Sequence, residues 1–241
     1  MTWVTLCAAL RHNRMGRIMN RKIKTTDSAP EYLALARHYE TCLEQHGASP
    51  KGMDWPKEDD LKTRFAVMLG IVRNPSMKRV SILDLGCGAG LLLDYLKEKR
   101  LLSNIEYTGL DISEKMVEIA KKRWPAYKFE RRDILQKPLA SQSYDYVIIN
   151  GLLNEKLTLP YKAMVKFAQR IIANAYTACR VGLAFNTMSK HVDWEREDLF
   201  HWPFDEAAAF LKKFCSRHII FRADYGLYEY TTYVFREHNT P

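Results

Sequence analysis

The stretch VSILDLGCGAG, residues 80–90, joins a short apolar run to three glycines placed at every second position. A run of this length that stops at glycine indicates a buried strand, and the helical composition of residues 91–99 indicates a helix directly after it. Glycines in such a loop let backbone amides approach a ligand at the N-terminus of the helix. The spacing differs from the dinucleotide pattern G-x-G-x-x-G, so the loop alone is either a ligand site or only a tight turn.

The same strand-and-helix unit recurs directly downstream. Residues 105–110 form a second apolar run, and residues 113–123 follow with Ser113 as the N-cap and an apolar helical face. Further strands are predicted at residues 127–131, 144–150, 181–187, 216–223 and 229–236, and further helices at residues 160–176 and 205–214. This alternation predicts an α/β fold, a doubly wound and mostly parallel sheet with helices on both faces. Residues 224–227 are too few for a crossover helix, so the last strand is expected to be antiparallel.

The residues ahead of the glycine loop predict helices. Apolar residues recur at helical spacing over residues 31–47, where Gly47 is a suitable stop, and a second apolar stripe follows the acidic residues 58–60 and ends near Asn74. We therefore expect a basic tail at residues 1–24, an N-terminal helical cap at residues 25–75 and a sheet domain at residues 76–241.

Composition limits the class of protein. The 241 residues are 47% hydrophobic, enough for one sizeable core, yet no segment approaches the roughly 18 consecutive apolar residues of a membrane span. The net charge is +9, but six basic residues and no acidic one lie in residues 1–24. A nucleic-acid partner is disfavoured, because the excess charge sits in this tail. The tail itself is interpreted either as a transit-type leader or as a non-native start ahead of Met15 or Met19.

The cysteines lie far apart in the sequence and include no C-x-x-C pair. They are Cys7, Cys42, Cys87, Cys179 and Cys215. This pattern predicts neither a disulfide framework nor a zinc site, and it fits a reducing, cytoplasmic environment. We therefore expect no metal ion in the functional site.

A carboxylate follows the second predicted strand. The strand ends in Gly109-Leu110-Asp111-Ile112, about 20 residues after the glycine loop. In an open doubly wound sheet the ligand sits at the carboxyl ends of the strands. Asp111 is therefore expected beside the glycine loop, where it can hold both hydroxyls of a ribose.

At these positions the chain resembles the class I S-adenosylmethionine-dependent methyltransferases, over about residues 60–236. The resemblance is carried by residues 80–90, 107–112, 132–134 and 144–150. It implies a Rossmann-like sheet and S-adenosyl-L-methionine as the cofactor. It also implies that Asp84, Gly86, Cys87 and Gly88 line the methionine portion, Asp111 and Ile112 the ribose, Asp133 and Ile134 the adenine, and Asn150 and Gly151 the sulfonium. Asp133 is alternatively a surface loop acid, and Arg64 either pairs with the cofactor carboxylate or lies exposed on its helix.

The methyl acceptor is narrowed by patterns that the chain lacks. Its fourth predicted strand ends in Asn150-Gly151-Leu152-Leu153 rather than in Asn-Pro-Pro-aromatic, and no Pro-Cys pair is present. Methylation of bases is therefore disfavoured. Residues 46–55, 186–198 and 224–233 look like those of a subgroup found with bacterial surface-polysaccharide and specialised-metabolite genes, which implies a small-molecule or glycan-precursor acceptor. RNA methylation and a non-catalytic cofactor-binding scaffold are the alternatives.

One histidine lies just past the fifth predicted strand, at the substrate side of the sheet. If the acceptor is a hydroxyl, His191 is expected to act as its base with Asp193 or Asp198 nearby, and His201 is a second candidate. The alternative is a solvated loop histidine that takes no part in catalysis.

Overall fold

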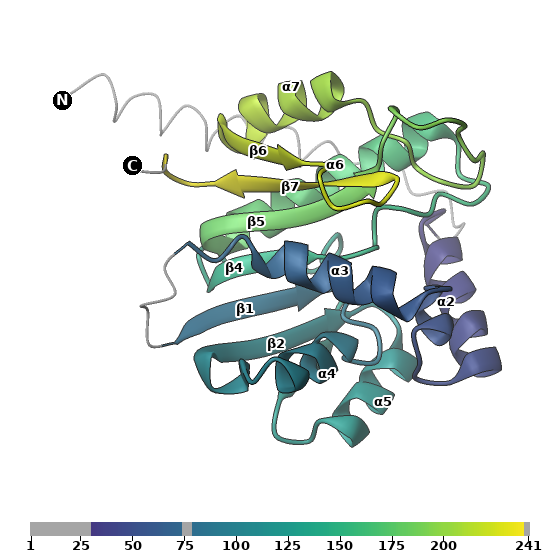
Figure 1. The fold of residues 1–241 in the computed structure, drawn as a ribbon, viewed down its shortest axis with the longest axis vertical. Coiled ribbons are helices and arrows are strands. Elements are labelled where there is room, and N and C mark those ends of the chain that lie inside the picture. The colour runs from purple at the N-terminus through teal and green to yellow at the C-terminus, as the bar shows by residue number, and fades with distance from the viewer. Residues whose placement is uncertain (1–29, 74–78, 239–241) are drawn as a thin grey trace. The chain divides into compact units, whose positions relative to one another are not determined.

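The computed structural model describes residues 30–73 and 79–238, in which helices and strands alternate as the sequence predicts (Figure 1). The helices are α2 (Leu33–His46), α3 (Glu58–Leu69), α4 (Leu91–Glu98), α5 (Glu114–Arg123), α6 (Tyr161–Ala178) and α7 (Phe204–Phe214), with short 3-10 turns η1 (Lys51–Met53) and η2 (Leu102–Asn104). The strands are β1 (Val80–Leu85), β2 (Ile105–Asp111), β3 (Lys128–Arg131), β4 (Tyr144–Ile149), β5 (Cys179–Met188), β6 (His218–Arg222) and β7 (Glu229–Phe235). The basic tail expected at residues 1–24 lies outside the described residues. None of the described helices has the length and apolar content that crossing a bilayer requires.

The described strands form one sheet with the order β3-β2-β1-β4-β5-β7-β6. Neighbouring strands from β3 to β5 are parallel, whereas β7 is antiparallel to both β5 and β6. The predicted doubly wound sheet is therefore confirmed, including the antiparallel strand at the end of the chain. The chain winds outward from β1 to β3 and restarts at β4 on the other side of β1, so the carboxyl ends of β1 and β4 meet at the switch point.

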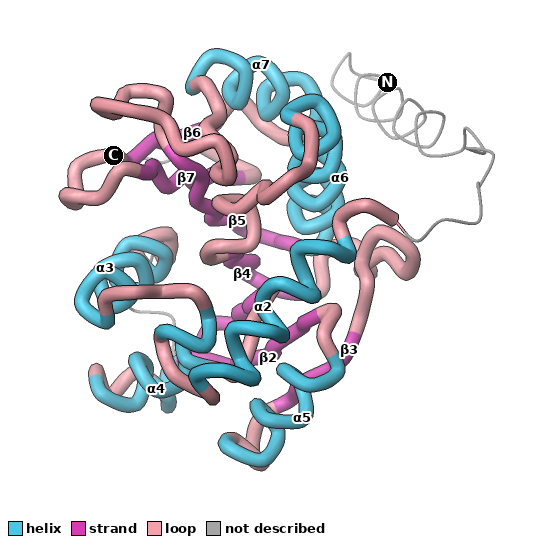
Figure 2. The backbone as a smooth tube through the Cα atoms, turned by 90° about the vertical axis from the view of Figure 1, so that its right-hand side faces the viewer, coloured by secondary structure: helices cyan, strands magenta, loops and turns pink. Residues whose placement is uncertain are grey.

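Helices cover both faces of the sheet (Figures 1 and 2). On one face α3, α4 and α5 pack against side chains such as Ile82 and Ile148, and on the other face α6 and α7 pack against Leu83 and Val147. Successive side chains of a strand point to opposite faces, so the central strands β1 and β4 carry nearly unbroken apolar runs. This two-sided burial holds the strand ends, and the loops that leave them, in place.

Helix α3 ends earlier than the sequence predicts. It ends at Leu69, whereas the predicted end near Asn74 lies outside the described residues. Gly70 has a low helix propensity, and the hydroxyl of Tyr233 donates a hydrogen bond to the carbonyl of Val67 in the last turn. A tertiary contact that no local pattern contains therefore helps to end this helix.

Helix α2 lies across the carboxyl ends of the parallel strands (Figure 2). At its start Tyr32 stacks on Phe167 of α6, with ring centroids 5.3 Å apart. Further along, Glu40 accepts a 2.6 Å hydrogen bond from Ser113, which is the N-cap of α5. Helix α2 is therefore anchored to helices on both sides of the sheet and covers the switch point.

Candidate functional site

A pocket opens at the carboxyl ends of β1 to β4, beneath helix α2. The loops that follow the strands form its sheet side, namely residues 84–88, 111–113, 132–134 and 150–152. The opposite side, which we call the cover, comes from the N-terminal helical segment. It is formed by Tyr32, Leu35, Ala36, Tyr39, Met53, Trp55, Leu61 and Phe65. The sheet and the N-terminal helices therefore enclose one pocket, which is mainly apolar apart from the strand-end carboxylates.

The glycine loop after β1 has a backbone conformation that requires glycine. The φ angle is +79° at Gly86, +51° at Gly88 and +78° at Gly90, in the left-handed region that L side chains rarely adopt. A Cβ on Gly88 would lie 2.6 Å from the sulfur of Met53, so the N-terminal helical segment closes on the loop at this point. The glycines therefore bring bare backbone to the pocket wall.

Asp111 holds the glycine loop from the end of β2. One carboxylate oxygen accepts the amide of Gly88 and the other accepts the amide of Ser113, each at 2.9 Å. Burial raises the pKa of Asp111, and the hydrogen bonds from these amides oppose that rise. Each carboxylate oxygen has a second lone pair, so Asp111 can still accept hydrogen bonds from two hydroxyl groups in the pocket.

Asp84, near the end of β1, is a buried carboxylate in the pocket wall. It is 5% exposed and accepts a 2.8 Å hydrogen bond from the hydroxyl of Tyr107. Burial raises its pKa to about 7, because one neutral donor does not replace the water that the charge loses. A cation beside Asp84 would favour its ionised form. Burial also raises the pKa of the neighbouring Cys87 thiol, which favours the protonated thiol.

Asp133, in the loop after β3, is hydrogen-bonded to the cover of the pocket. Its Oδ2 accepts a 2.6 Å hydrogen bond from the hydroxyl of Tyr32, and its Oδ1 accepts the amide of Leu135 at 2.9 Å. Asp133 lines the pocket together with the buried Ile134, which distinguishes it from an ordinary surface acid. One lone pair of each oxygen is thus in use and one is free.

Asn150 and Gly151, at the end of β4, meet an aromatic wall. The amide of Gly151 donates to Asn186 at 2.8 Å, and its φ of +84° is in the left-handed region. A Cβ on Gly151 would lie 2.4 Å from the ring of Trp55, and the hydroxyl of Tyr39 donates to the Gly151 carbonyl at 3.5 Å. The side-chain oxygen of Asn150 is buried and has no partner among the described residues, so this end of the pocket offers an unused acceptor.

Arg64 lies behind the pocket wall rather than in it. Its Nε donates to Glu229 at 2.9 Å, and its guanidinium stacks over Trp55 at 4.2 Å from the ring centroid. The buried Glu229 also accepts hydrogen bonds from Asn154, Asn186 and Tyr225. The structure differs from both expectations for Arg64, because its side chain is only 11% exposed and Glu229 already holds it. Arg64 therefore supports Trp55 from outside the pocket. The other ten residues that were expected to bind the cofactor all line the pocket.

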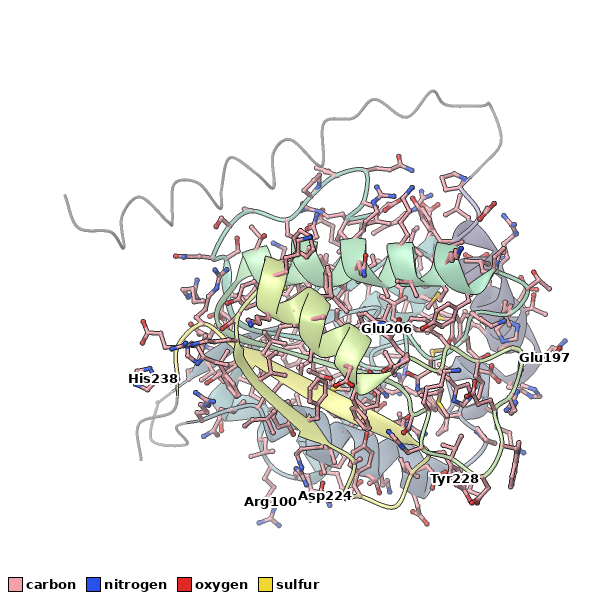
Figure 3. All side chains as sticks on the ribbon, turned by 90° about the horizontal axis from the view of Figure 1, so that it is seen from above. Arg100, Glu197, Glu206, Asp224, Tyr228 and His238 are labelled. Atoms are coloured by element: carbon pink, nitrogen blue, oxygen red, sulfur yellow. The ribbon has the colours of Figure 1, made fainter. Side chains whose placement is uncertain are left out.

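His191 and Asp193 lie outside this pocket. The imidazole of His191 is exposed and stacks on Phe204, with ring centroids 5.3 Å apart. Asp193 lines a separate cavity with Trp194 and Tyr228, and Figure 3 marks Tyr228 on the turn between β6 and β7. The structure therefore does not bring the expected base together with the strand-end carboxylates.

The two weaker candidates are engaged within the same loop. The Nδ1 of the buried His201 lies 2.6 Å from the carbonyl of Ser189, and its Nε2 accepts the amide of Arg196 at 3.3 Å. Asp198 pairs with the guanidinium of Arg196. Both ring nitrogens of His201 are therefore used in holding the loop after β5.

Sequence reasoning missed part of the cover of the pocket. Tyr32 and Tyr39 line it although Tyr39 had counted only as an apolar position of its helix, whereas Met53 and Trp55 lie in residues 46–55, which the resemblance had linked to the acceptor. The available signal was the aromatic residues spread over residues 32–55, ahead of the first strand. No local pattern states which strand ends such residues cover.

A glycine loop and three strand-end carboxylates around one pocket, at the switch point of a doubly wound sheet, define a nucleotide-cofactor-binding α/β protein. Residues 76–194 match the family model of the methyltransferase domain. Rv1506c of Mycobacterium tuberculosis, which is assigned to the methyltransferases, is 33% identical over 161 residues that cover 64% of this chain and 92% of the relative. A malonyl-[acyl-carrier protein] O-methyltransferase of Enterobacter lignolyticus is 31% identical over 96 residues, or 40% of this chain and 36% of that protein.

Solved methyltransferase structures share the fold. The magnesium protoporphyrin IX methyltransferase of Synechocystis with bound S-adenosylmethionine has a TM-score of 0.62 at 16% identity, over 88% of this chain and 100% of that chain. A methyltransferase of Leishmania major has a TM-score of 0.60 at 16% identity, over 86% of this chain and 83% of that chain. The chain belongs to the class I S-adenosylmethionine-dependent methyltransferases, and S-adenosylmethionine is its cofactor.

Proposed function

We propose that this enzyme binds S-adenosylmethionine in the pocket of Asp84, Asp111 and Asp133 and methylates a small molecule. The acceptor class is a glycan precursor or phosphorylated metabolite with a hydroxyl or amine as the target atom. The observation that supports a small acceptor is the cover: Tyr39 and Trp55 close over Gly151, so the methyl-transfer end is walled by aromatic rings. Such a wall suits a compact acceptor.

The residues of the pocket fit this cofactor. S-Adenosylmethionine carries an ammonium and a sulfonium, and Asp84 offers a buried carboxylate that a cation would keep ionised. Asp111 offers acceptor lone pairs for two ribose hydroxyls, and Asp133 offers one for an adenine amine. Gly86 and Gly88 present bare backbone to the pocket where the methionine portion would lie.

When bound, the cofactor would supply an electrophilic methyl group: an acceptor lone pair would bond to the methyl carbon in line as the methyl–sulfur bond breaks, S-adenosylhomocysteine would leave with that electron pair, and the acceptor would lose a proton. The part of this chain is to align the acceptor and exclude water, which Trp55 and Tyr39 do by covering Gly151. The Glu229–Arg64 pair holds Trp55 in place from the far side. We assign proton removal to neither His191 nor Asp193, because neither side chain lines this pocket.

The test is methyl transfer from labelled S-adenosylmethionine to a panel of nucleotide sugars, sugar phosphates and amines. We expect acceptor-dependent release of S-adenosylhomocysteine with at least one member, abolished in Trp55→Ala and retained in Trp194→Ala, which alters an exposed tryptophan outside the pocket. Transfer to RNA alone, with salt-dependent affinity, would favour the RNA methyltransferase instead. Binding of the cofactor without transfer to any acceptor would favour a scaffold.

A further inference from the structure

Three side chains of the N-terminal helical segment bring metal-ligand atoms to one point outside the cofactor pocket. The Nε2 of His38, the Sγ of Cys42 and a carboxylate oxygen of Asp54 all lie within 4.8 Å of one another. The distance from Nε2 to the Asp54 Oδ2 is 2.8 Å, and from Nε2 to Sγ it is 3.8 Å. One nitrogen, one sulfur and one oxygen thus lie close together.

The backbone explains why these atoms converge. His38 and Cys42 are separated by four residues on α2, so their side chains share one face of the helix. Asp54 follows the 3-10 turn η1 in the left-handed conformation, with φ of +59°, and its amide donates to Lys51. Aspartate is among the residues that adopt this conformation most readily, and the turn places the Asp54 carboxylate beside His38.

The donor set and its spacing match a zinc-type ion. With zinc–ligand bonds of about 2.0 to 2.3 Å and tetrahedral angles, neighbouring ligand atoms lie roughly 3.4 to 3.6 Å apart. The His38–Asp54 hydrogen bond is shorter than that range, the His38–Cys42 separation is slightly longer, and all three ligand atoms lie within 4.8 Å, so side-chain rotations would bring them around an ion. We propose that His38, Cys42 and Asp54 bind a divalent transition-metal ion of the zinc type, with a fourth position left for water or another ligand.

The surrounding charge favours a cation. Burial, and then the charge of Asp54, raise the pKa of the half-buried Glu155 to about 7. Asp54 and Asp198 are the acidic groups that act on Glu155, and Arg196 and His38 are the basic groups that act on it. A divalent ion would relieve that repulsion and would favour the thiolate.

The site lies beside the cover of the pocket. Tyr39 is next to His38 on α2, and Trp55 directly follows Asp54, and both residues cover Gly151. An ion shared by His38, Cys42 and Asp54 would therefore tie α2 to the segment that carries Trp55. This consequence for the cover rests on the proposed function, whereas binding of the ion does not.

The experiment uses the full chain after treatment with a chelator, titrated with Co²⁺ and then with Zn²⁺. We expect one ion per chain, with a near-ultraviolet thiolate-to-cobalt absorption band that Zn²⁺ displaces. Cys42→Ser should remove the band, and His38→Ala and Asp54→Ala should each weaken Zn²⁺ affinity at least about tenfold in a chelator competition. The matched controls are His46→Ala, at the exposed end of the same helix, and Cys215→Ser, which should both bind as the wild type does.

Circular dichroism of the metal-free variants separates a lost site from a lost fold, and no step of the titration depends on the cofactor or on methyl transfer. Sub-stoichiometric binding by the wild type, or a cobalt band that persists unchanged in Cys42→Ser, would overturn the proposal.

Discussion

The hydroxyl of Tyr32 donates a 2.6 Å hydrogen bond to Oδ2 of Asp133, which joins the start of α2 to the loop after β3. Burial and the hydrogen bond to Asp133 raise the pKa of Tyr32 to about 12, so the phenol keeps its proton and remains a donor. The ring of Tyr32 also stacks on Phe167. The start of the cover is therefore hydrogen-bonded to Asp133, the carboxylate that we propose as the acceptor for the adenine amine.

Because of this hydrogen bond, we expect substitutions of Asp133 and of Tyr32 to change the affinity for S-adenosylmethionine by different amounts. Asp133→Ala should weaken S-adenosylmethionine binding about tenfold or more, because a hydrogen bond to a charged group contributes about 1.5 to 3 kcal/mol. Tyr32→Phe keeps the stacked ring and frees a lone pair of Asp133, so its affinity should stay within about threefold of the wild type. Titration calorimetry measures both, and equal losses would show that Asp133 serves only to latch the cover.

Asp111→Ala should weaken cofactor binding at least tenfold and also lower the melting temperature. The substitution removes the acceptors of the Gly88 and Ser113 amides, so the glycine loop loses its support as well as its ribose ligand. Asp94→Ala is the control, because Asp94 makes an exposed ion pair with Arg123 and should change neither quantity appreciably. Unchanged affinity in Asp111→Ala would contradict the proposed position of the ribose.

Asp84 predicts a pH dependence of stability. Its pKa is raised from 3.8 unfolded to about 7 folded, so the folded chain binds this proton more tightly and the free energy of unfolding falls as pH rises between these values. Asp84→Asn keeps an acceptor for Tyr107 and has no charge to bury. The cofactor-free variant should therefore melt higher than the wild type at pH 8 and about equally with it near pH 3.5.

With cofactor bound at pH 8, the wild type should melt higher than Asp84→Asn. S-Adenosylmethionine should raise the melting temperature of the wild type more at pH 8 than at pH 6, since only ionised Asp84 attracts its positive groups, and should raise that of Asp84→Asn little. Scanning fluorimetry at three pH values measures both effects. A variant stabilised by the cofactor as much as the wild type would argue against Asp84 as a ligand.

Gly151→Ala should lower methyl transfer at least tenfold. Its Cβ would lie 2.4 Å from the Trp55 ring, in addition to the strain of a positive φ. Gly226→Ala provides the control, because Gly226 has φ of +74° but no atom within 4 Å of the position that a Cβ would take, so it carries the strain without the collision. If both variants lose activity equally, backbone strain rather than contact with Trp55 explains the effect.

His191→Ala should leave turnover within about threefold of the wild type on any acceptor found. Its imidazole stacks on Phe204 outside the pocket, and a base that takes a proton in the transition state would contribute about 10² or more. Initial rates at saturating cofactor decide the matter. A loss of a hundredfold or more, with cofactor affinity unchanged, would restore the role that the sequence had suggested for this histidine.

The sheet and the sheet side of the pocket followed from the sequence by itself. A strand that ends in spaced glycines before a helix, and an acid at the end of the next strand, are local patterns, as at residues 80–90 and Asp111. Right-handed crossovers and the switch-point rule then leave few arrangements, so the local patterns also predicted that these strand ends would meet.

Only the tertiary structure decided what covers the pocket. Tyr32 and Asp133 are 101 residues apart, and Arg64 and Glu229 are 165 residues apart, so their pairing depends on how α2 and α3 dock and not on any local period. The same holds for Asp54, which a left-handed turn brings to His38 and Cys42 although cysteine spacing had argued against a metal site. The loop after β5 carries His191 away to Phe204, since a strand end determines where a loop begins but packing determines where its side chains go.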